Sequence, residues 1–253
     1  MSQALLQVRD LVRHFAGVRA VDGVSLDIDA GQCVALIGPN GAGKSTLFAC
    51  LAGQQNPTSG QVLWLGHSLL GKSPSQRLEM GVGRSFQVAQ VFEALTVLAN
   101  VQLALQARAA AVSAWQALAL WQTEQAMALL AQAGLAELAG QIAGSLPYGA
   151  KKRLELAIVL AGQPRLLLLD EPAAGLAEQE RVRLMAWVRS LVHQGLAVLY
   201  TEHNMDAVQG VADRVLVLIE GRLVAQGRFD EVAADPFVQA RYLGRFREDM
   251  RHA

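Results

Sequence analysis

The sequence is poor in the features that mark secreted or membrane-spanning chains. It contains 2 cysteines in 253 residues, too few for a disulfide framework. Cys33 lies in an apolar run and Cys50 in a segment expected to be helical, so we expect two small buried residues rather than a disulfide or metal pair. Residues 1–9 lack the basic start and the long apolar stretch of a signal peptide. A cytosolic compartment fits these absences.

Long hydrophobic runs are also missing. The longest apolar-leaning stretch without charge covers residues 109–123, which is 15 residues long and contains Ser113, Gln116 and Gln122. A helix that crosses a bilayer needs about 20 mostly apolar residues. We therefore do not expect this stretch to span a membrane.

Neither sign of charge dominates, since Lys plus Arg number 22 and Asp plus Glu number 22. Without a global basic field, nucleic acid is not an expected partner. Apolar residues make up 52% of the chain and charged residues 17%, against roughly 45–50% and 25% in typical soluble domains. The apolar excess indicates interfaces with partner proteins.

A glycine-rich stretch at residues 38–46 follows the apolar run at residues 33–37 and fits the phosphate-binding pattern G-x-x-x-x-G-K-[ST] at every defined position. Its glycines allow a tight turn in which several backbone N–H groups point into one concavity and meet a polyphosphate. The predicted nucleotide-binding residues of this stretch are Gly38, Pro39, Asn40, Gly41, Ala42, Gly43, Lys44, Ser45 and Thr46.

Two side chains of this loop carry specific chemistry. Lys44 adds a positive charge for the β and γ phosphates, and Ser45 offers its hydroxyl to Mg²⁺. Residues 45–52 contain no glycine or proline and are expected to form a helix whose N-terminus favours the bound anion. The alternative is a glycine-rich turn that binds nothing. The motif alone leaves kinases, GTPases, helicases and transport ATPases open.

The remaining pattern predicts an α/β fold. Short β-leaning runs at residues 5–12 and 24–28 indicate a small antiparallel layer before the loop. Strands alternating with helices around a phosphate loop then predict a mostly parallel sheet. The further expected strands are residues 61–65, 82–87, 166–169 and 196–200, with a hairpin formed by 215–219 and 223–225.

Helices are expected at residues 151–161 and 178–193, and residues 95–138 read as a helical subdomain because they are rich in Ala, Leu and Gln at helical spacing. The apolar stripe of this subdomain is expected to serve its own packing rather than a ligand. An aromatic residue upstream, Phe15, is a candidate for stacking on adenine, although most such residues simply belong to a core.

Two of these expected strands are followed directly by residues that can bind ligands or transfer protons. Asp170 and Glu171 directly follow the four leucines 166–169, and His203 follows the run 196–200 after two polar residues. The carboxyl ends of parallel strands are where α/β sheets place their ligand chemistry. Taken singly, Glu171 could cap a helix and His203 could be a satisfied core histidine.

In this order the pieces resemble the nucleotide-binding subunit of ABC transporters. The matching positions are the phosphate loop, Gln87 in Ser85-Phe86-Gln87, Leu146-Pro147-Tyr148-Gly149, residues 166–171 and His203. The resemblance implies one P-loop NTPase domain over residues 1–253, with a RecA-like mostly parallel sheet. Residues 1–88 and 155–240 would form the catalytic core and β layer, residues 89–154 an inserted α-helical subdomain, and residues 241–253 a solvated tail.

The same resemblance implies roles for single residues. Asp170 would hold Mg²⁺ through its water shell, alongside Ser45 and Gln87, Glu171 would polarise the attacking water, and His203 would reach the γ-phosphate of ATP. Phosphoryl transfer needs charge neutralisation, a fixed metal and an oriented nucleophile more than covalent chemistry, and these residues supply such groups.

Two positions depart from the family pattern. The signature that commonly reads Leu-Ser-Gly-Gly-Gln is Leu-Pro-Tyr-Gly-Ala at residues 146–150, so its serine hydroxyl is missing, and Ala177 stands where an aspartate is often found. Tyr148 and Gly149 remain expected nucleotide contacts, because the backbone of Gly149 at a helix start can still meet an anion. Both elements normally act across a dimer, so we expect a second ATPase subunit, the same or paralogous, in a head-to-tail arrangement.

Within the family, residues 84–101, the Pro-Tyr-Gly signature, residues 170–176 and residues 235–244 resemble the importers of branched-chain amino acids and their urea-importing relatives. This implies transmembrane permease subunits, a separate substrate-binding protein and a peripheral location on the cytoplasmic face of the membrane. The alternatives are an exporter of lipids or drugs, an ABC protein of DNA repair or translation, and a P-loop kinase or GTPase.

Overall fold

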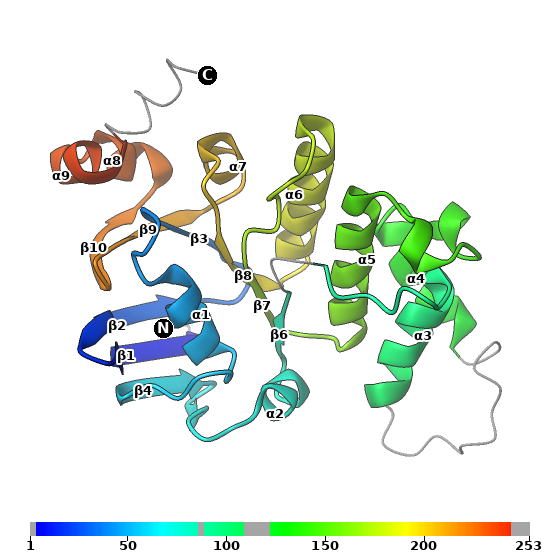
Figure 1. The fold of residues 1–253 in the computed structure, drawn as a ribbon, viewed down its shortest axis with the longest axis horizontal. Coiled ribbons are helices and arrows are strands. Elements are labelled where there is room, and N and C mark those ends of the chain that lie inside the picture. The colour runs from blue at the N-terminus through cyan, green and yellow to red at the C-terminus, as the bar shows by residue number, and fades with distance from the viewer. Residues whose placement is uncertain (1–3, 86–88, 109–121, 244–253) are drawn as a thin grey trace.

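The computed structural model describes residues 4–85, 89–108 and 122–243 and folds them around two sheets (Figure 1). The first sheet has the order β2-β1-β4-β5 and is antiparallel throughout. The expected antiparallel layer is thus confirmed, and its two longest strands run further than the sequence predicted. The strands are β1 (Leu6–Phe15), β2 (Val18–Ile28), β4 (Ser59–Trp64) and β5 (His67–Ser68).

The second sheet has the order β10-β9-β3-β8-β7-β6 and is parallel from β9 to β6, with β10 antiparallel at one edge. The strand that leads into the phosphate loop, β3, lies between β9 and β8. The expected α/β fold with a mostly parallel sheet is confirmed. Its strands are β3 (Cys33–Ile37), β6 (Val82–Arg84), β7 (Leu166–Leu169), β8 (Ala197–Thr201), β9 (Arg214–Ile219) and β10 (Arg222–Gly227).

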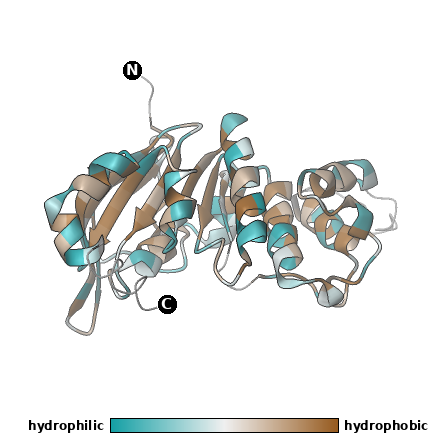
Figure 2. Ribbon diagram, turned by 90° about the horizontal axis from the view of Figure 1, so that it is seen from above, coloured by the Kyte–Doolittle hydropathy of each residue, from teal (hydrophilic) through white to brown (hydrophobic). Residues whose placement is uncertain are grey.

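Successive side chains of the buried strands enter two different cores, because side chains alternate across a strand. In β7, Leu166 and Leu168 join the cluster that faces the antiparallel layer, whereas Leu167 and Leu169 join the cluster under α6. Burial on both faces explains the run of four leucines. Figure 2 shows these strands as hydrophobic ribbons beside helices of mixed character.

The helices cover both faces and one end of the parallel sheet. The expected helix at residues 178–193 matches α6 at both ends, whereas α5 begins at Tyr148, three residues before the predicted start, with Pro147 as its N-cap residue. The α-helices are α1 (Lys44–Leu51), α2 (Pro74–Glu79), α3 (Val97–Arg108), α4 (Thr123–Gln132), α5 (Tyr148–Ala161), α6 (Glu178–His193), α7 (Met205–Gln209), α8 (Phe229–Ala234) and α9 (Pro236–Val238).

A third apolar cluster joins α3, α4 and α5 at one end of the molecule (Figure 1). Helix α5 belongs to two clusters, since Leu156 and Leu160 face α6 whereas Leu154 and Ala157 face α3 and α4. The helical region is therefore packed onto the sheet through α5. The exact boundaries between the catalytic core, the helical subdomain and the tail remain predictions.

Two further expectations concern the ends and the membrane. The tail was expected to be solvated from residue 241 on, but Tyr242 is buried in the cluster under α6, and burial raises the pKa of its hydroxyl to about 12. The aromatic ring supplies enough apolar area to explain this packing.

Within the described residues, none of the helices has the length and apolar character needed to cross a membrane.

Candidate active site

The phosphate loop is shaped by backbone that surrounds it on several sides. A Cβ atom at Gly38 would lie 2.0 Å from the carbonyl oxygen of Leu218, and one at Gly43 would lie 2.0 Å from that of Ala20. Gly43 also has φ +101°, which side chains disfavour. Only glycine therefore fits at these two positions.

A turn from a distant part of the chain supports the same loop. The N–H of Gly221, between β9 and β10, donates to the carbonyl of Ala42 at 2.9 Å, and the N–H of Asp22 donates to the carbonyl of Gly221 at 2.9 Å. Strand β2, the loop and the β9–β10 hairpin are thus fixed to one another. The loop is part of the folded framework rather than a flexible appendage.

Lys44 starts α1 and turns its side chain back into the loop. Its Nζ donates to the carbonyls of Gly38 and Pro39 at 2.7 Å and 3.0 Å, and the residue is only 7% exposed. Burial lowers the pKa of this amine, and the nearby charges of Glu171 and Asp170 act in the opposite direction. A buried cation held by two carbonyls of the loop is suited to binding a phosphate.

Asp170 follows β7 and is held from both sides. Its Oδ1 accepts a hydrogen bond from the hydroxyl of Thr201 at 2.8 Å, and its Oδ2 lies 3.3 Å from a guanidinium nitrogen of Arg84 at the end of β6. Burial lowers the pKa of Arg84, opposed by the charge of Asp170. Three neighbouring strands therefore converge on this carboxylate.

Glu171 and His203 come from the loops that follow the paired strands β7 and β8, and their side chains are in contact. The Nε2 of His203 lies 2.7 Å from Oε1 of Glu171, and the side chains of His203 and Glu171 are 36% and 21% exposed. Glu171 has φ +47°, a left-handed conformation that is uncommon for a residue with a side chain. Backbone of this kind clusters at functional sites.

Glu202 is a buried carboxylate between these residues in the chain. Its Oε1 accepts from the N–H of Ala173 at 3.1 Å, and its Oε2 accepts from the N–H of His203 at 3.2 Å. Burial raises its pKa, although the backbone hydrogen bonds act against this. Glu202 thus joins the loop after β7 to the loop that carries His203.

The structure brings together most of the predicted site. Lys44, Asp170, Glu171 and His203 stand at the carboxyl ends of β3, β7 and β8, which are adjacent in the sheet. Ser45 lies in the first turn of α1 beside Lys44 and is exposed. Gln87 lies outside the described residues.

Three other predicted contacts lie outside the phosphate loop, and the adenine contact of Phe15 stays a prediction. Phe15 ends β1, is 38% exposed and has the guanidinium of Arg13 at 4.5 Å from its ring centroid. Tyr148 and Gly149 start α5, which is separated from α1 by β6, β7 and β8 (Figure 1). Neither residue of α5 therefore belongs to the phosphate-loop cluster of its own chain.

Sequence reasoning missed Arg84, Thr201 and Glu202 as parts of the site. The signal for the last two was present, because both are polar residues at the end of an apolar strand and directly precede His203. Arg84 carried no such signal, since its contact with Asp170 depends on β6 lying next to β7.

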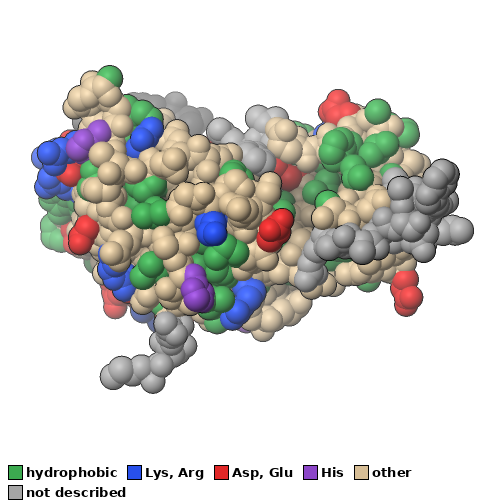
Figure 3. All heavy atoms as spheres, turned by 90° about the horizontal axis from the view of Figure 1, so that it is seen from below, with side chains coloured by type: hydrophobic (Ala, Val, Ile, Leu, Met, Phe, Trp, Pro, Cys, Tyr) green, Lys and Arg blue, Asp and Glu red, His purple; other side chains and the backbone are tan. Residues whose placement is uncertain are grey.

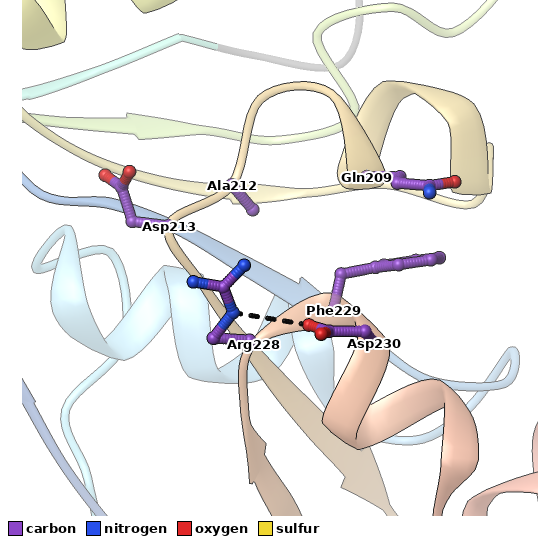
Figure 4. Close-up of a pocket in the computed structure, with 6 residues that line it drawn as sticks. All are labelled: Gln209, Ala212, Asp213, Arg228, Phe229 and Asp230. Atoms are coloured by element: carbon purple, nitrogen blue, oxygen red, sulfur yellow. Dashed lines mark hydrogen bonds and ion pairs between the residues drawn. The ribbon is translucent and has the colours of Figure 1, made fainter.

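A large cavity lies apart from this cluster. It has a volume of about 640 Å³, lies between α7 and α8 and is lined by charged and apolar residues, among them Asp213, Arg228 and Phe229 (Figure 4). Its Arg228 pairs with Asp230 at 3.4 Å, and both side chains are exposed. On the molecular face in Figure 3, basic and acidic side chains of the described residues are interspersed rather than gathered into one basic patch.

Comparisons with known proteins agree with the geometry. A family model described as ABC transporter matches residues 21–174. The chain is 38% identical to the high-affinity branched-chain amino acid transport ATP-binding protein LivG of Salmonella typhimurium, with 96% of this chain and 99% of LivG covered. It is 35% identical to BraF of Pseudomonas aeruginosa, a protein of the same description, over 96% of this chain and 99% of BraF.

Solved structures give the same result. The ADP conformation of MJ1267, an ATP-binding cassette of an ABC transporter, superposes with a TM-score of 0.86 at 29% identity, covering 96% of this chain and 100% of that one. A nucleotide-free cassette from an ABC transporter superposes with a TM-score of 0.84 at 28% identity, covering 95% and 99% of the two chains. The chain therefore belongs to the ABC transporter family and is one of its ATP-binding cassettes.

Proposed function

We propose that this ATPase binds ATP with Mg²⁺ at residues 38–46 and hydrolyses it with Glu171 and His203. The observation that carries the proposal is the contact of 2.7 Å between Glu171 and His203 at the carboxyl end of β7 and β8, beside the strand that bears the phosphate loop. A carboxylate paired with an imidazole next to a polyphosphate site is suited to holding a water molecule for in-line attack.

The residues present fit ATP and magnesium. Only glycine fits at Gly38 and Gly43, where a Cβ would meet the carbonyls of Leu218 and Ala20, and the tight loop that results holds the Lys44 amine against its own carbonyls. Ser45 and Asp170, with Gln87, offer oxygen ligands, which Mg²⁺ prefers, and it commonly uses one or two protein ligands plus substrate phosphates. When bound, the metal would supply charge neutralisation on the transferred phosphoryl group.

The protein's own groups then have distinct tasks. Lys44 would exchange the carbonyls of Gly38 and Pro39 for phosphate oxygens. Glu171 would accept a hydrogen bond from the attacking water and so orient its lone pair toward phosphorus. His203 would contact the γ-phosphate while keeping its hydrogen bond to Glu171, which holds the two groups in one geometry.

The start of α5 is proposed to serve the site of a second subunit. Tyr148 and Gly149 lie apart from the phosphate loop, and the first turn of a helix favours anions. A dimeric structure of the bacterial cassette MJ0796 is known, and at 22% identity it shares the fold with this chain. We therefore propose a head-to-tail dimer with the same or a paralogous chain, in which each α5 faces the partner's ATP.

We propose import of branched-chain amino acids as the process that this hydrolysis powers. The support is the likeness to LivG and BraF, both branched-chain amino acid transport ATP-binding proteins that match nearly the whole chain. The proposed partners are transmembrane permease subunits and a separate substrate-binding protein, with this subunit peripheral on the cytoplasmic face of the membrane. Urea is the alternative cargo.

The catalytic assignment is tested by Glu171→Gln. We expect ATP turnover to fall by at least about 100-fold, because the amide cannot accept and orient the water as a carboxylate does, while ATP affinity changes little. Glu178→Gln, an exposed carboxylate on the first turn of α6, is the matched control. Unchanged turnover in the Glu171 variant would contradict the assignment.

The dimer is tested by Gly149→Asp, which places a negative charge at the start of α5. We expect ATP binding to the chain's own loop to persist and turnover of the assembled complex to fall, since the charge repels the partner's γ-phosphate.

The cargo is tested by isolating the subunit with its native partners. A co-purifying binding protein that takes leucine supports the proposal, and one that takes urea overturns it.

A further inference from the structure

Thr201 is the last residue of β8 and is fully buried, at 0% exposure. The parallel register pairs Tyr200 with Leu169 of β7, so the next residues of the two strands, Thr201 and Asp170, are neighbours across the sheet. The proposed hydrolysis gives this threonine no task of its own. Its hydroxyl nevertheless contacts two acidic residues of the site, Asp170 and Glu171.

The hydroxyl of Thr201 bridges these two residues. It donates to Oδ1 of Asp170 at 2.8 Å and accepts from the backbone N–H of Glu171, also at 2.8 Å. Because a backbone N–H can only donate, the hydroxyl must accept there, and its single proton is directed to the carboxylate. The two hydrogen bonds together therefore set the orientation of the Thr201 hydroxyl.

The accepted bond acts at a strained point of the backbone. Glu171 has φ +47°, a left-handed conformation that is unfavourable for a residue with a side chain. The hydrogen bond from its N–H to Thr201 holds the peptide in this conformation. The same conformation directs the Glu171 carboxylate to His203, 2.7 Å away.

The donated bond acts on the other carboxylate. The hydroxyl of Thr201 holds Oδ1 of Asp170, and Arg84 approaches Oδ2 at 3.3 Å from the opposite neighbouring strand. Asp170 is therefore oriented by two groups that belong to different strands. Because Thr201 is bonded to Glu171 as well, it couples the positions of the two acidic residues to each other.

We propose that Thr201 is a positioning residue for phosphoryl transfer: its hydroxyl fixes Asp170, the proposed metal ligand, and Glu171, the proposed water-orienting residue, in one mutual arrangement. The inference rests on the proposed roles of Asp170 and Glu171, and Thr201 acts through these two residues. It contributes geometry, on which rates depend steeply, since a displacement of about 1 Å can cost about 100-fold.

The test is Thr201→Val, which replaces the hydroxyl by a methyl group of similar size. In the full-length chain assembled with its native partners, we expect kcat for ATP to fall about 10- to 100-fold and the affinity for ATP to change less than about threefold. Thr201→Ser keeps the hydroxyl and is expected to retain activity within about threefold of the parent. The split between kcat and affinity, with rescue by serine, separates positioning from a general loss of stability.

Thr58→Val is the control for the substitution itself, since the hydroxyl of Thr58 also accepts a backbone hydrogen bond, from the N–H of His14 at 3.1 Å, but is exposed and directly precedes β4, away from the site. The proposal is overturned if Thr201→Val lowers kcat no more than Thr58→Val, or if Thr201→Ser is as impaired as the valine variant. Should the valine variant not fold, Thr201→Cys is compared with Thr201→Ser by the same criteria.

Glu171→Gln is measured in parallel so that the two proposals fail separately. If this variant loses turnover while Thr201→Val does not, the role of Thr201 is wrong and the catalytic assignment stands. If Glu171→Gln keeps full turnover, the assignment of Glu171 fails, and with it the positioning role of Thr201.

Discussion

Two helix starts in this molecule are proposed to meet a phosphate, and they are built in different ways. At the start of α1, a Cβ on Gly38 or Gly43 would meet a backbone carbonyl at 2.0 Å. At the start of α5, a Cβ on Gly149 would meet the carboxylate of Glu180 at 2.5 Å, which is the end of a flexible side chain. The first is enclosed by backbone, and the second is bordered by groups that can move.

The side chains at the two helix starts differ in how far they are buried and held. Lys44 is 7% exposed and held by two loop carbonyls, whereas Tyr148 is 40% exposed. A site enclosed by backbone cannot change shape without moving the framework, whereas a site bordered by a flexible side chain can change shape by a rotation of that side chain. The difference teaches that the shape of the α1 site is set by its own backbone, and it agrees with the proposal that the α5 start serves a second chain.

The largest expected effect that tests this comparison is that of Gly43→Ala. The added Cβ meets the Ala20 carbonyl and the backbone has φ +101°, so we expect a loss of roughly 2–5 kcal/mol in the free energy of unfolding and loss of ATP binding. Urea unfolding and nucleotide titration measure both. Gly41→Ala is the control, because its φ of +80° is unfavourable but no atom lies within 4 Å of its Cβ. Equal losses in the two variants would break the comparison.

An intermediate effect is expected from the buried carboxylate Glu202, which lies between the loops after β7 and β8. Burial raises its pKa above the ordinary 4.5, so the native state binds this proton more tightly than the unfolded state does. Its contribution to stability is therefore present in full below about pH 4.5 and is lost as the pH rises through the raised pKa. The loss amounts to about 1.4 kcal/mol for every pH unit that separates the native pKa from the unfolded one.

Glu202→Gln removes this titration. We expect the free energy of unfolding to fall less between pH 5 and pH 8 in the variant than in the parent, as measured by urea unfolding at each pH. Glu178→Gln, at an exposed position, serves as the control. Identical pH profiles for parent and Glu202→Gln would contradict the burial of a titrating group here.

The smallest effect is expected for Gly149→Ala at the start of α5. The Glu180 side chain can rotate away from the new Cβ, and alanine favours a helix over glycine by up to about 1 kcal/mol, so the two effects oppose each other. We expect the free energy of unfolding to change by less than about 1 kcal/mol. Urea unfolding of this variant beside Gly43→Ala measures the difference. A loss comparable to that of Gly43→Ala would show that α5 starts in an equally rigid frame.

Local sequence patterns predicted the parts of the site that are contiguous in the chain. The phosphate loop, the carboxylates after β7 and His203 after β8 all follow an apolar strand closely, so the position of each is set by a few neighbouring residues. The bounds of α6 followed in the same way from its continuous helical pattern. Helix α2 was missed although Ser73 and Gln76 form a capping box around Pro74.

Contacts between strands distant in sequence could not be predicted in this way. The bonds of Thr201 to Asp170 and of Arg84 to Asp170 require that β8, β7 and β6 be adjacent in that order, which no local pattern specifies. The positive φ of Glu171 likewise results from the packing around it. A positive φ is usually signalled in the sequence by a glycine, and this position has none. The helical pattern of residues 151–161 did not include the first turn of α5, whereas the family resemblance already placed Gly149 at a helix start beside Pro147.

The place of β3 in the sheet has a consequence for synthesis of the protein on the ribosome. β3 is made early, yet both of its neighbours, β8 and β9, are made late, and the bond from the N–H of Cys33 to the Asp213 carboxylate joins positions 180 residues apart. A nascent chain therefore carries an apolar strand with two unpaired edges until most of the protein has been translated. Such edges invite association with other chains. Completion of the sheet, and with it of the phosphate loop, must await the last quarter of the polypeptide.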